Sequence, residues 1–304
     1  MKKRLADFWF EPAPAARLAI LRLIIGAFAV NLFLGNRIKL LAPMRFPESM
    51  FEPVGVIRLL SGPMPAQLLP PLVTIATIFA VAFWLGLFFR FTGPVFAALL
   101  WWILTYRNSW SMIFHYENVL VLHVLVLALA PSADDFSVDA LRRRARGGNA
   151  ECYGWPIKLM NLITVGTYAF AGFAKLTGPT WKEWPTGEVV RAWIAHDQLR
   201  KTVLGSHSSD VIVAIYDQKW MFFVFAVGTL ILECGAPIAL VNRRISRVWA
   251  AGAFLMHWCI YFIMAIIFPY HMFGFIFVPF FRVEKILEWR PLRWIVGPQN
   301  QVSD

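Results

Sequence analysis

The sequence predicts an all-α, polytopic transmembrane helix bundle of about eight helices, with the N- and C-termini in the cytoplasm. Of its 304 residues, 59% are hydrophobic and 15% are charged, and the mean hydropathy is +0.59. Soluble domains average about 25% charged residues. A membrane crossing takes roughly 20 apolar residues, so eight crossings with short connectors fill a chain of this length. The composition therefore favours an integral membrane protein whose main partner is the lipid bilayer.

Eight apolar segments are the expected membrane helices. They span residues 16–34, 71–89, 94–106, 116–130, 155–176, 220–241, 248–268 and 272–281. The third, fourth and eighth are short, so we expect them to be tilted, re-entrant or extended into the neighbouring loops. The basic start and first apolar segment also fit a signal peptide, but no small-residue cleavage site follows, and we expect a retained helix.

Basic residues set the expected orientation, since Lys and Arg favour cytoplasmic connectors. With the N-terminus inside, the inner connectors contain Lys2, Lys3, Arg4, Arg90, Arg142, Arg143, Arg144, Arg146, Arg243, Arg244, Arg247, Arg282, Lys285, Arg290 and Arg293. The outer connectors, 35–70 and 177–219, mix basic and acidic residues. This pattern predicts a transmembrane domain over residues 1–282 and a short cytoplasmic tail over 283–304.

The net charge of +11 does not indicate a nucleic-acid partner, because the basic residues lie between apolar segments rather than in one block. The cysteines Cys152, Cys234 and Cys259 show no CxxC or Cys/His metal spacing. We expect them to be inert core thiols.

Ionisable side chains inside apolar segments cost roughly 2.5–3.5 kcal/mol each at a helix centre, so each needs a partner, a wet cavity or a function. At 1.5 Å per residue, Arg22 in the first segment and Glu233 in the sixth lie about 9–12 Å from the cytoplasmic face. We expect a structural ion pair between them, which spares the membrane two unpaired charges. A proton or ion relay is the alternative interpretation.

A second polar group is expected at the outer face. The stretch HYENVLVLH places His115, Glu117 and Asn118 at the outer end of the fourth segment, with His123 deeper. The further candidates are Tyr168 and Lys175 in the fifth segment, His257 in the seventh, and Tyr270 and His271 between the seventh and eighth. We expect these side chains, which come from different helices, to line one outward-open cavity.

Each of these residues also has a simpler interpretation. Lys175 at a helix end fits a lysine whose ammonium group reaches out to water. His123 and His257 fit buried interhelical hydrogen bonds, and Glu117 fits a solvated carboxylate at the membrane interface. No metal is expected, because residues 115 and 123 lack the i,i+4 spacing of two ligands on one helix.

Five motifs follow one another along most of the chain. They are ARLAILRLIIGAF with Arg22 and Gly26, FHYENVLVLHVLVLALAPSADDFSVDA, YAFAGFAKLTGPTW, LECGAP, and LMHWCIYFIMAIIFPYHMFGF. The most specific are SVD at residues 137–139 and AGxxKL at residues 171–176. In order and spacing the chain resembles the HTTM family, the horizontally transferred transmembrane domain of vitamin K-dependent gamma-carboxylase and of many short bacterial proteins.

The resemblance implies a reaction. In the carboxylase, a lysine base deprotonates a vitamin K hydroquinone, oxygen adds, and the collapsing peroxide gives an epoxide and an alkoxide that removes a glutamate γ-proton before carbon dioxide adds. Lys175 falls at the position of that base, His257 near a carboxylase histidine, and His115 within one residue of another. For a reaction of this type the candidate catalytic residues are Lys175, His115, His257 and Glu117, and the candidate quinol-binding residues are Asn118, His123, Tyr168 and Tyr270.

The chain ends at Asp304, so we expect the lumenal C-terminal domain of the carboxylase to be absent. Three functions stay open. The chain is a quinol-dependent, carboxylase- or quinol-epoxidase-like lyase acting with a secreted peptide or protein substrate, a non-catalytic partner or maturation factor for secreted peptides, or a small-solute transporter. No inverted repeat supports the transporter. In a bacterium, the helical architecture predicts the inner (plasma) membrane.

Overall fold

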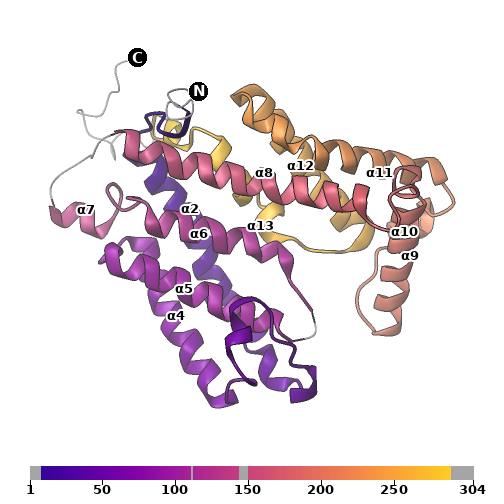
Figure 1. Ribbon diagram of the computed structural model, residues 1–304, viewed down its shortest axis with the longest axis horizontal. Coiled ribbons are helices and arrows are strands. Elements are labelled where there is room, and N and C mark those ends of the chain that lie inside the picture. The colour runs from indigo at the N-terminus through magenta and orange to yellow at the C-terminus, as the bar shows by residue number, and fades with distance from the viewer. Residues whose placement is uncertain (1–7, 111, 144–149, 289–304) are drawn as a thin grey trace. The chain divides into compact units, whose positions relative to one another are not determined.

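The computed structural model describes residues 8–110, 112–143 and 150–288 (Figure 1). Within these ranges the chain is helical, and its β-type pairing is an isolated bridge between Phe51 and Trp110. The chain divides into two compact units, which are Met1–Met160 with Arg282–Asp304, and Asn161–Phe281. Each unit is described by itself.

Four helical segments of the described residues are long and apolar enough to cross a membrane. They are Ala15–Gly35, Ala66–Leu85, Ala150–Thr177 and Arg243–Met264, and His115–Leu129 is a shorter apolar helix. The predicted all-α membrane fold is therefore confirmed, whereas the cytoplasmic position of both termini stays a prediction.

The first unit is built from α2 (Ala15–Gly35), α4 (Leu69–Leu85), α5 (Phe89–Asn108) and α6 (Asn118–Leu129). Helix α2 packs against α4 and α6, and α5 packs against the same two helices (Figure 1). Fully buried apolar side chains such as Ile25, Phe33, Phe83 and Phe96 form its core. Two short helices, α3 (Arg37–Leu40) and α7 (Val138–Arg143), complete the unit together with 3-10 turns in the connector between α3 and α4.

Local sequence explains the ends of α4. Prolines stand in its first turn, where the missing N–H costs no intrahelical hydrogen bond. The helix ends at Gly86, which adopts the left-handed conformation at φ 65°. A β-carbon at Gly86 would lie 2.5 Å from Cβ of Ser137, so this turn needs glycine for its backbone conformation and also for its close approach.

The segment after residue 281 is tied to α2. Glu284 belongs to the 3-10 turn Val283–Glu288. Its carboxylate accepts two hydrogen bonds from Arg17 of α2, at 2.8 and 2.5 Å. Burial raises the pKa of Glu284, but the hydrogen bonds and charge of Arg17 outweigh it and hold that pKa below its usual value. The remainder of the predicted tail, 289–304, lies outside the described residues.

The second unit contains most of α8 (Gly154–Thr177), then α9 (Glu188–Val203), α10 (Asp210–Ile215), α11 (Lys219–Cys234), α12 (Arg243–Met264) and α13 (Pro269–Met272). Helix α11 packs against α9 and α12, and α12 also packs against α9, α10 and α13. Ile194, Ile212 and Phe222 form a small buried cluster that joins α9, α10 and α11.

Side chains cap helix α12 at both ends. At its start, the Asn242 side chain accepts hydrogen bonds from the backbone N–H groups of Arg244 and Ile245. At its end, Ser209, Gln198 and Lys201 donate to the carbonyl oxygens of Phe262, Ile263 and Met264, respectively. The last carbonyls of a helix have no intrahelical donor. Here α9 and the segment leading into α10 provide donors for these carbonyl oxygens.

The connector 177–219 contains the helices α9 and α10, and two expectations about the apolar segments need correction. The sixth segment, 220–241, is α-helical only to Cys234 and continues as the 3-10 turn Ala236–Leu240, which has a proline in its first turn. The eighth, 272–281, is a 3-10 segment, Phe275–Phe280, because Gly274 at φ 76° ends the short α13 and Pro279 prevents a regular helix.

Candidate functional site

The most distinctive polar contact of the second unit joins Lys175 near the end of α8 to Glu233 near the end of α11. The ammonium Nζ donates to both carboxylate oxygens, at 2.8 Å to Oε1 and 2.6 Å to Oε2. The Lys175 side chain is 21% exposed and that of Glu233 is 8% exposed. Two charges held in an apolar helix pair at this distance form a strong charge-assisted contact.

This contact corrects the depth expected from the sequence. Lys175 was predicted near the outer face and Glu233 in the cytoplasmic half of the bilayer, which is incompatible with a contact of 2.6 Å. Both residues lie near the C-terminal ends of their helices, so the contact requires these two ends to lie at the same depth. Helix α11 has 16 residues and is not among the candidate spans, so the assumption that it crosses the bilayer from the outer to the cytoplasmic face placed Glu233 wrongly. Glu233 lies at the end of its helix rather than in its interior.

Gly172 allows the two helices to approach. A β-carbon at this position would lie 2.7 Å from Sγ and 2.9 Å from the backbone nitrogen of Cys234, and 3.0 Å from Cβ of Glu233. A real side chain at this position would collide with α11. The small residues before Lys175 therefore serve close helix packing, as in other membrane helix pairs.

An aromatic ring also lies close to the lysine ammonium group. Nζ of Lys175 is 5.2 Å from the ring centroid of Trp184, within the range of a cation–π interaction. Trp184 belongs to the 3-10 turn Trp184–Thr186 before α9. The ammonium group is therefore held by a carboxylate and by an indole face.

An open apolar groove of about 460 Å³ adjoins the pair. It is lined by Ala169, Phe170, Phe173, Leu176 and Cys234. Leu176 follows Lys175 in the chain and Cys234 follows Glu233, so each charged residue is the chain neighbour of a residue that lines the groove. Cys234 is exposed, as is Cys259, which corrects the expectation that these two thiols are buried in the core.

Tyr168 extends the site along α8. It shares a helix face with Gly172 and Lys175, at i, i+4 and i+7. Its hydroxyl lies 3.4 Å from Nδ1 of His257, and that nitrogen lies 2.8 Å from the carbonyl oxygen of Ala253. A carbonyl oxygen only accepts, so Nδ1 of His257 carries a proton.

The rings around His257 form a compact cluster. The ring of His271 stacks on it with centroids 4.4 Å apart and 23° between the planes. Tyr270 is 1% exposed, and its ring lies 6.4 Å from that of Phe275. Five predicted site residues, Lys175, Tyr168, His257, Tyr270 and His271, thus belong to one unit, together with Glu233, which had been predicted to pair elsewhere.

The other predicted site residues belong to the first unit. His115 and Asn118 are exposed at the start of α6. Glu117 is 5% exposed, and its carboxylate accepts from Arg107 at 2.6 Å, so the expectation of a solvated carboxylate is wrong. His123 is fully buried, and its Nε2 lies 3.2 Å from the carbonyl oxygen of Met160 in α8. This contact is the buried interhelical hydrogen bond that was one of the two interpretations of His123. The convergence of both groups on one cavity stays a prediction.

Arg107 is a residue that the sequence interpretation missed. It lies in the last turn of α5, 5% exposed, and its guanidinium carbon is 4.2 Å from the ring centroid of Phe114. The expected span over 94–106 ended one residue before it. The pairing with Glu117, ten residues on, shows that α5 and the turn before α6 meet through a buried ion pair.

Arg22 and Glu233 were predicted to form an ion pair with each other, but in the structure each of them has other partners. The guanidinium of Arg22, fully buried, donates to three backbone carbonyls, those of Trp84 at 3.3 Å, Ser132 at 2.6 Å and Phe136 at 2.5 Å. Glu233 is paired with Lys175 in the second unit. Three backbone acceptors disperse the positive charge of Arg22, so this residue connects α2 to the end of α4 and to the loop after α6.

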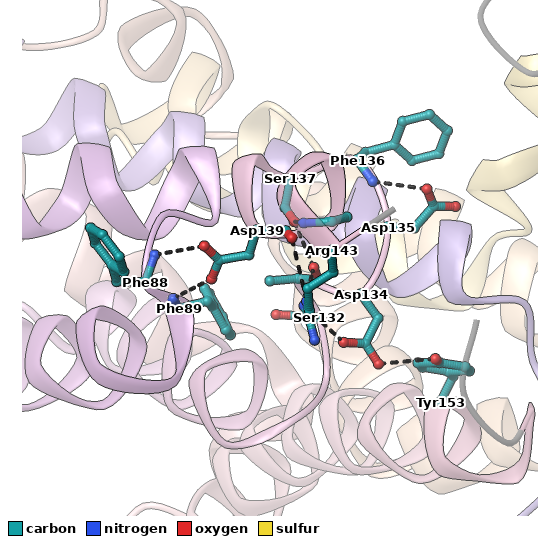
Figure 2. A network of polar contacts seen from close by, with 12 residues as sticks. Phe88, Phe89, Ser132, Asp134, Asp135, Phe136, Ser137, Asp139, Arg143 and Tyr153 are labelled. Atoms are coloured by element: carbon teal, nitrogen blue, oxygen red, sulfur yellow. Dashed lines mark hydrogen bonds and ion pairs between the residues drawn. The ribbon is translucent and has the colours of Figure 1, made fainter. Parts of the chain in front are cut away.

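The SVD motif is a helix cap. Asp139 accepts hydrogen bonds from the backbone N–H groups of Phe88, at 2.9 Å, and Phe89, at 2.7 Å, at the start of α5 (Figure 2). Ser137 caps α7 by accepting from the N–H of Ala140 at 2.8 Å. The motif therefore holds the turn between α4 and α5, and we assign it a structural role.

Removing this cap has a graded expected effect. Asp139→Ala leaves two N–H groups at a helix start without their acceptor and should lower the free energy of unfolding by about 1–2 kcal/mol. Asp139→Asn keeps one acceptor oxygen and should cost less. Chemical unfolding in detergent micelles, followed by tryptophan fluorescence, measures both; equal stability of Asp139→Ala and the parent protein would contradict the assignment.

These features define a class of protein, a helical integral membrane protein that places an ion pair beside an apolar groove. A family model of the HTTM domain matches residues 10–285, which is most of the chain. The chain belongs to the HTTM domain family. Comparisons with curated proteins and with solved structures gave no match.

Proposed function

We propose that this chain is a membrane enzyme of the carboxylase-like type, in which Lys175 acts as a base toward a lipophilic quinol. The observation that carries the proposal is the Lys175–Glu233 pair, whose Nζ and Oε2 atoms are 2.6 Å apart beside an apolar groove of about 460 Å³. An amine next to an apolar surface suits a substrate with an acidic hydroxyl and a hydrocarbon tail. The family membership supports the same chemistry.

The groove fits the apolar part of such a substrate. Phe170 and Phe173 are largely exposed and supply aromatic faces against which a quinol ring or an isoprenoid chain can pack. Lys175 is 21% exposed, and its chain neighbour Leu176 lines the groove. Lys175 then orients and deprotonates the hydroxyl, and Tyr168 and His257 support the site from the next turns of α8 and from α12.

Lys175→Arg is the sharpest test of this proposal. A guanidinium keeps the ion pair with Glu233, but it does not lose its proton in proteins and cannot act as a base. With purified protein in nanodiscs, a short-chain naphthohydroquinone and air, we expect epoxide formation to fall by roughly 100-fold or more, the loss typical of a missing general base.

The matched control is Lys182→Ala, which removes an exposed lysine from the loop that follows α8. It should keep the parent rate. Equal epoxide formation by Lys175→Arg and the parent protein would remove Lys175 as the base. Absence of epoxide with the parent protein would reject the quinol reaction itself.

A second candidate function is that of a non-catalytic partner or maturation factor for secreted peptides. The exposed face of α9 favours it, because Trp193, Leu199 and Val203 are 60%, 65% and 75% exposed on a helix that is not among the candidate spans. If the chain has this second function, the Lys175–Glu233 pair has a structural role and joins α8 to α11. Lys175→Arg would then preserve peptide maturation in cells, and Trp193→Glu would abolish it.

A further inference from the structure

A lysine that is paired with a carboxylate cannot accept a proton as it stands. The ammonium group has three N–H donors and no lone pair. Lys175 must therefore lose a proton before it removes one from a substrate, and the structure has to supply an acceptor within hydrogen-bond distance.

Glu233 is that acceptor by geometry. Its two carboxylate oxygens lie 2.8 and 2.6 Å from Nζ of Lys175, a distance at which a proton passes between nitrogen and oxygen with little movement of the heavy atoms. Gly172 fixes this distance, because Cβ of Glu233 lies against the position where a side chain of residue 172 would begin.

Transfer of a proton from Lys175 to Glu233 is also compatible with the burial of the pair. Ammonium with carboxylate is neutral overall, and so is amine with carboxylic acid. Neither state leaves a net charge in apolar surroundings, where an uncompensated charge is costly. A base whose proton went to bulk water would leave the Glu233 carboxylate, 8% exposed, without a counter-ion.

We propose that Glu233 takes up the proton that Lys175 must lose and that the deprotonated substrate then replaces Glu233 as the counter-ion of Lys175. This inference rests on the proposed function of Lys175 as a base. In the first step an N–H bond of Lys175 breaks and an O–H bond of Glu233 forms. In the second step the substrate O–H bond breaks, its proton adds to the Lys175 amine, and the electron pair stays on the substrate oxygen.

The overall result is one proton moved from the substrate to Glu233. The site stays neutral, because the substrate anion faces the Lys175 ammonium and Glu233 is a neutral acid. Trp184 keeps its place in both states, since its ring face, 5.2 Å from Nζ, attracts the ammonium group whichever anion accompanies it. Glu233 is thus a positioning residue that acts through Lys175.

Infrared difference spectroscopy tests this directly. The full-length protein in nanodiscs is mixed anaerobically with a short-chain naphthohydroquinone, so that proton transfer occurs without oxygen chemistry. We expect the absorbance of the deprotonated naphthohydroquinone to appear together with a carboxylic-acid C=O band, in equal amounts. The band should disappear in Glu233→Gln and shift in frequency in Glu233→Asp, which retains an acid at this position.

Glu183→Gln, which changes an exposed glutamate in the loop after α8, is the matched control and should retain the band. Deprotonated naphthohydroquinone without a carboxylic-acid band, or a band that persists unchanged in both Glu233 variants, overturns the inference and leaves Lys175 as base. No deprotonation by the parent protein overturns the proposed function and this inference with it. The two failures are therefore distinguishable.

Discussion

Arg22→Met should lower the free energy of unfolding by about 3 kcal/mol, roughly 1 kcal/mol for each backbone carbonyl that loses its donor. The carbonyls are those of Trp84, Ser132 and Phe136, which come from α4 and the loop after α6. Methionine fills much of the same volume, so the loss reports the hydrogen bonds rather than a cavity. The site is fully buried, and water cannot replace the guanidinium without opening the unit.

Unfolding titrations with an anionic detergent, followed by tryptophan fluorescence, measure this effect. Arg90→Met makes the same substitution at an exposed position of α5 in the same unit and should change stability by less than about 0.5 kcal/mol. A comparable loss in both variants would show that the carbonyl contacts of Arg22 contribute little.

Gly172→Ala should cost about 1–3 kcal/mol through overpacking, although it adds a single methyl group. The new β-carbon would collide with the backbone nitrogen of Cys234 at 2.9 Å, so α8 and α11 must move apart. That movement lengthens the contact between Lys175 and Glu233. We therefore expect epoxide formation to fall together with stability.

Gly166→Ala is the matched control on the same helix. The nearest atom to its added β-carbon is 4.0 Å away, on the Phe170 ring, and an alanine there should stabilise α8 by up to about 1 kcal/mol. The two glycine variants should thus change stability in opposite directions. If both stabilise the protein, the close approach at Gly172 does not limit the packing of α8 on α11.

Hydropathy predicted the long helices well, because an uninterrupted apolar run has few alternatives to a helix in a membrane protein. The runs over 16–34 and 155–176 appear as α2 and α8 within one or two residues at each end. Helix α9 was missed because its polar residues hide it from a hydropathy scan, although its apolar residues Val190 and Ile194 pack in the second unit.

The site was predicted in part. Lys175 followed from its motif, but its partner did not follow from the sequence. Depth counting assumes that each apolar run is one straight helix across the bilayer, and the end of α11 at Cys234 breaks that assumption for Glu233. The signal that could have indicated a close helix contact here is Gly172, since a glycine in a membrane helix lets another backbone come close.

The capping of α12 by Ser209, Gln198 and Lys201 has a consequence for where this helix stops. A helix in a membrane ordinarily has to reach the polar headgroup region before its last carbonyls find water as a donor. Helix α12 instead receives its donors from α9 and from the segment leading into α10. Its length is therefore set by the fold rather than by the thickness of the surrounding lipid, and the backbone turn after Met264 need not lie in the headgroup region.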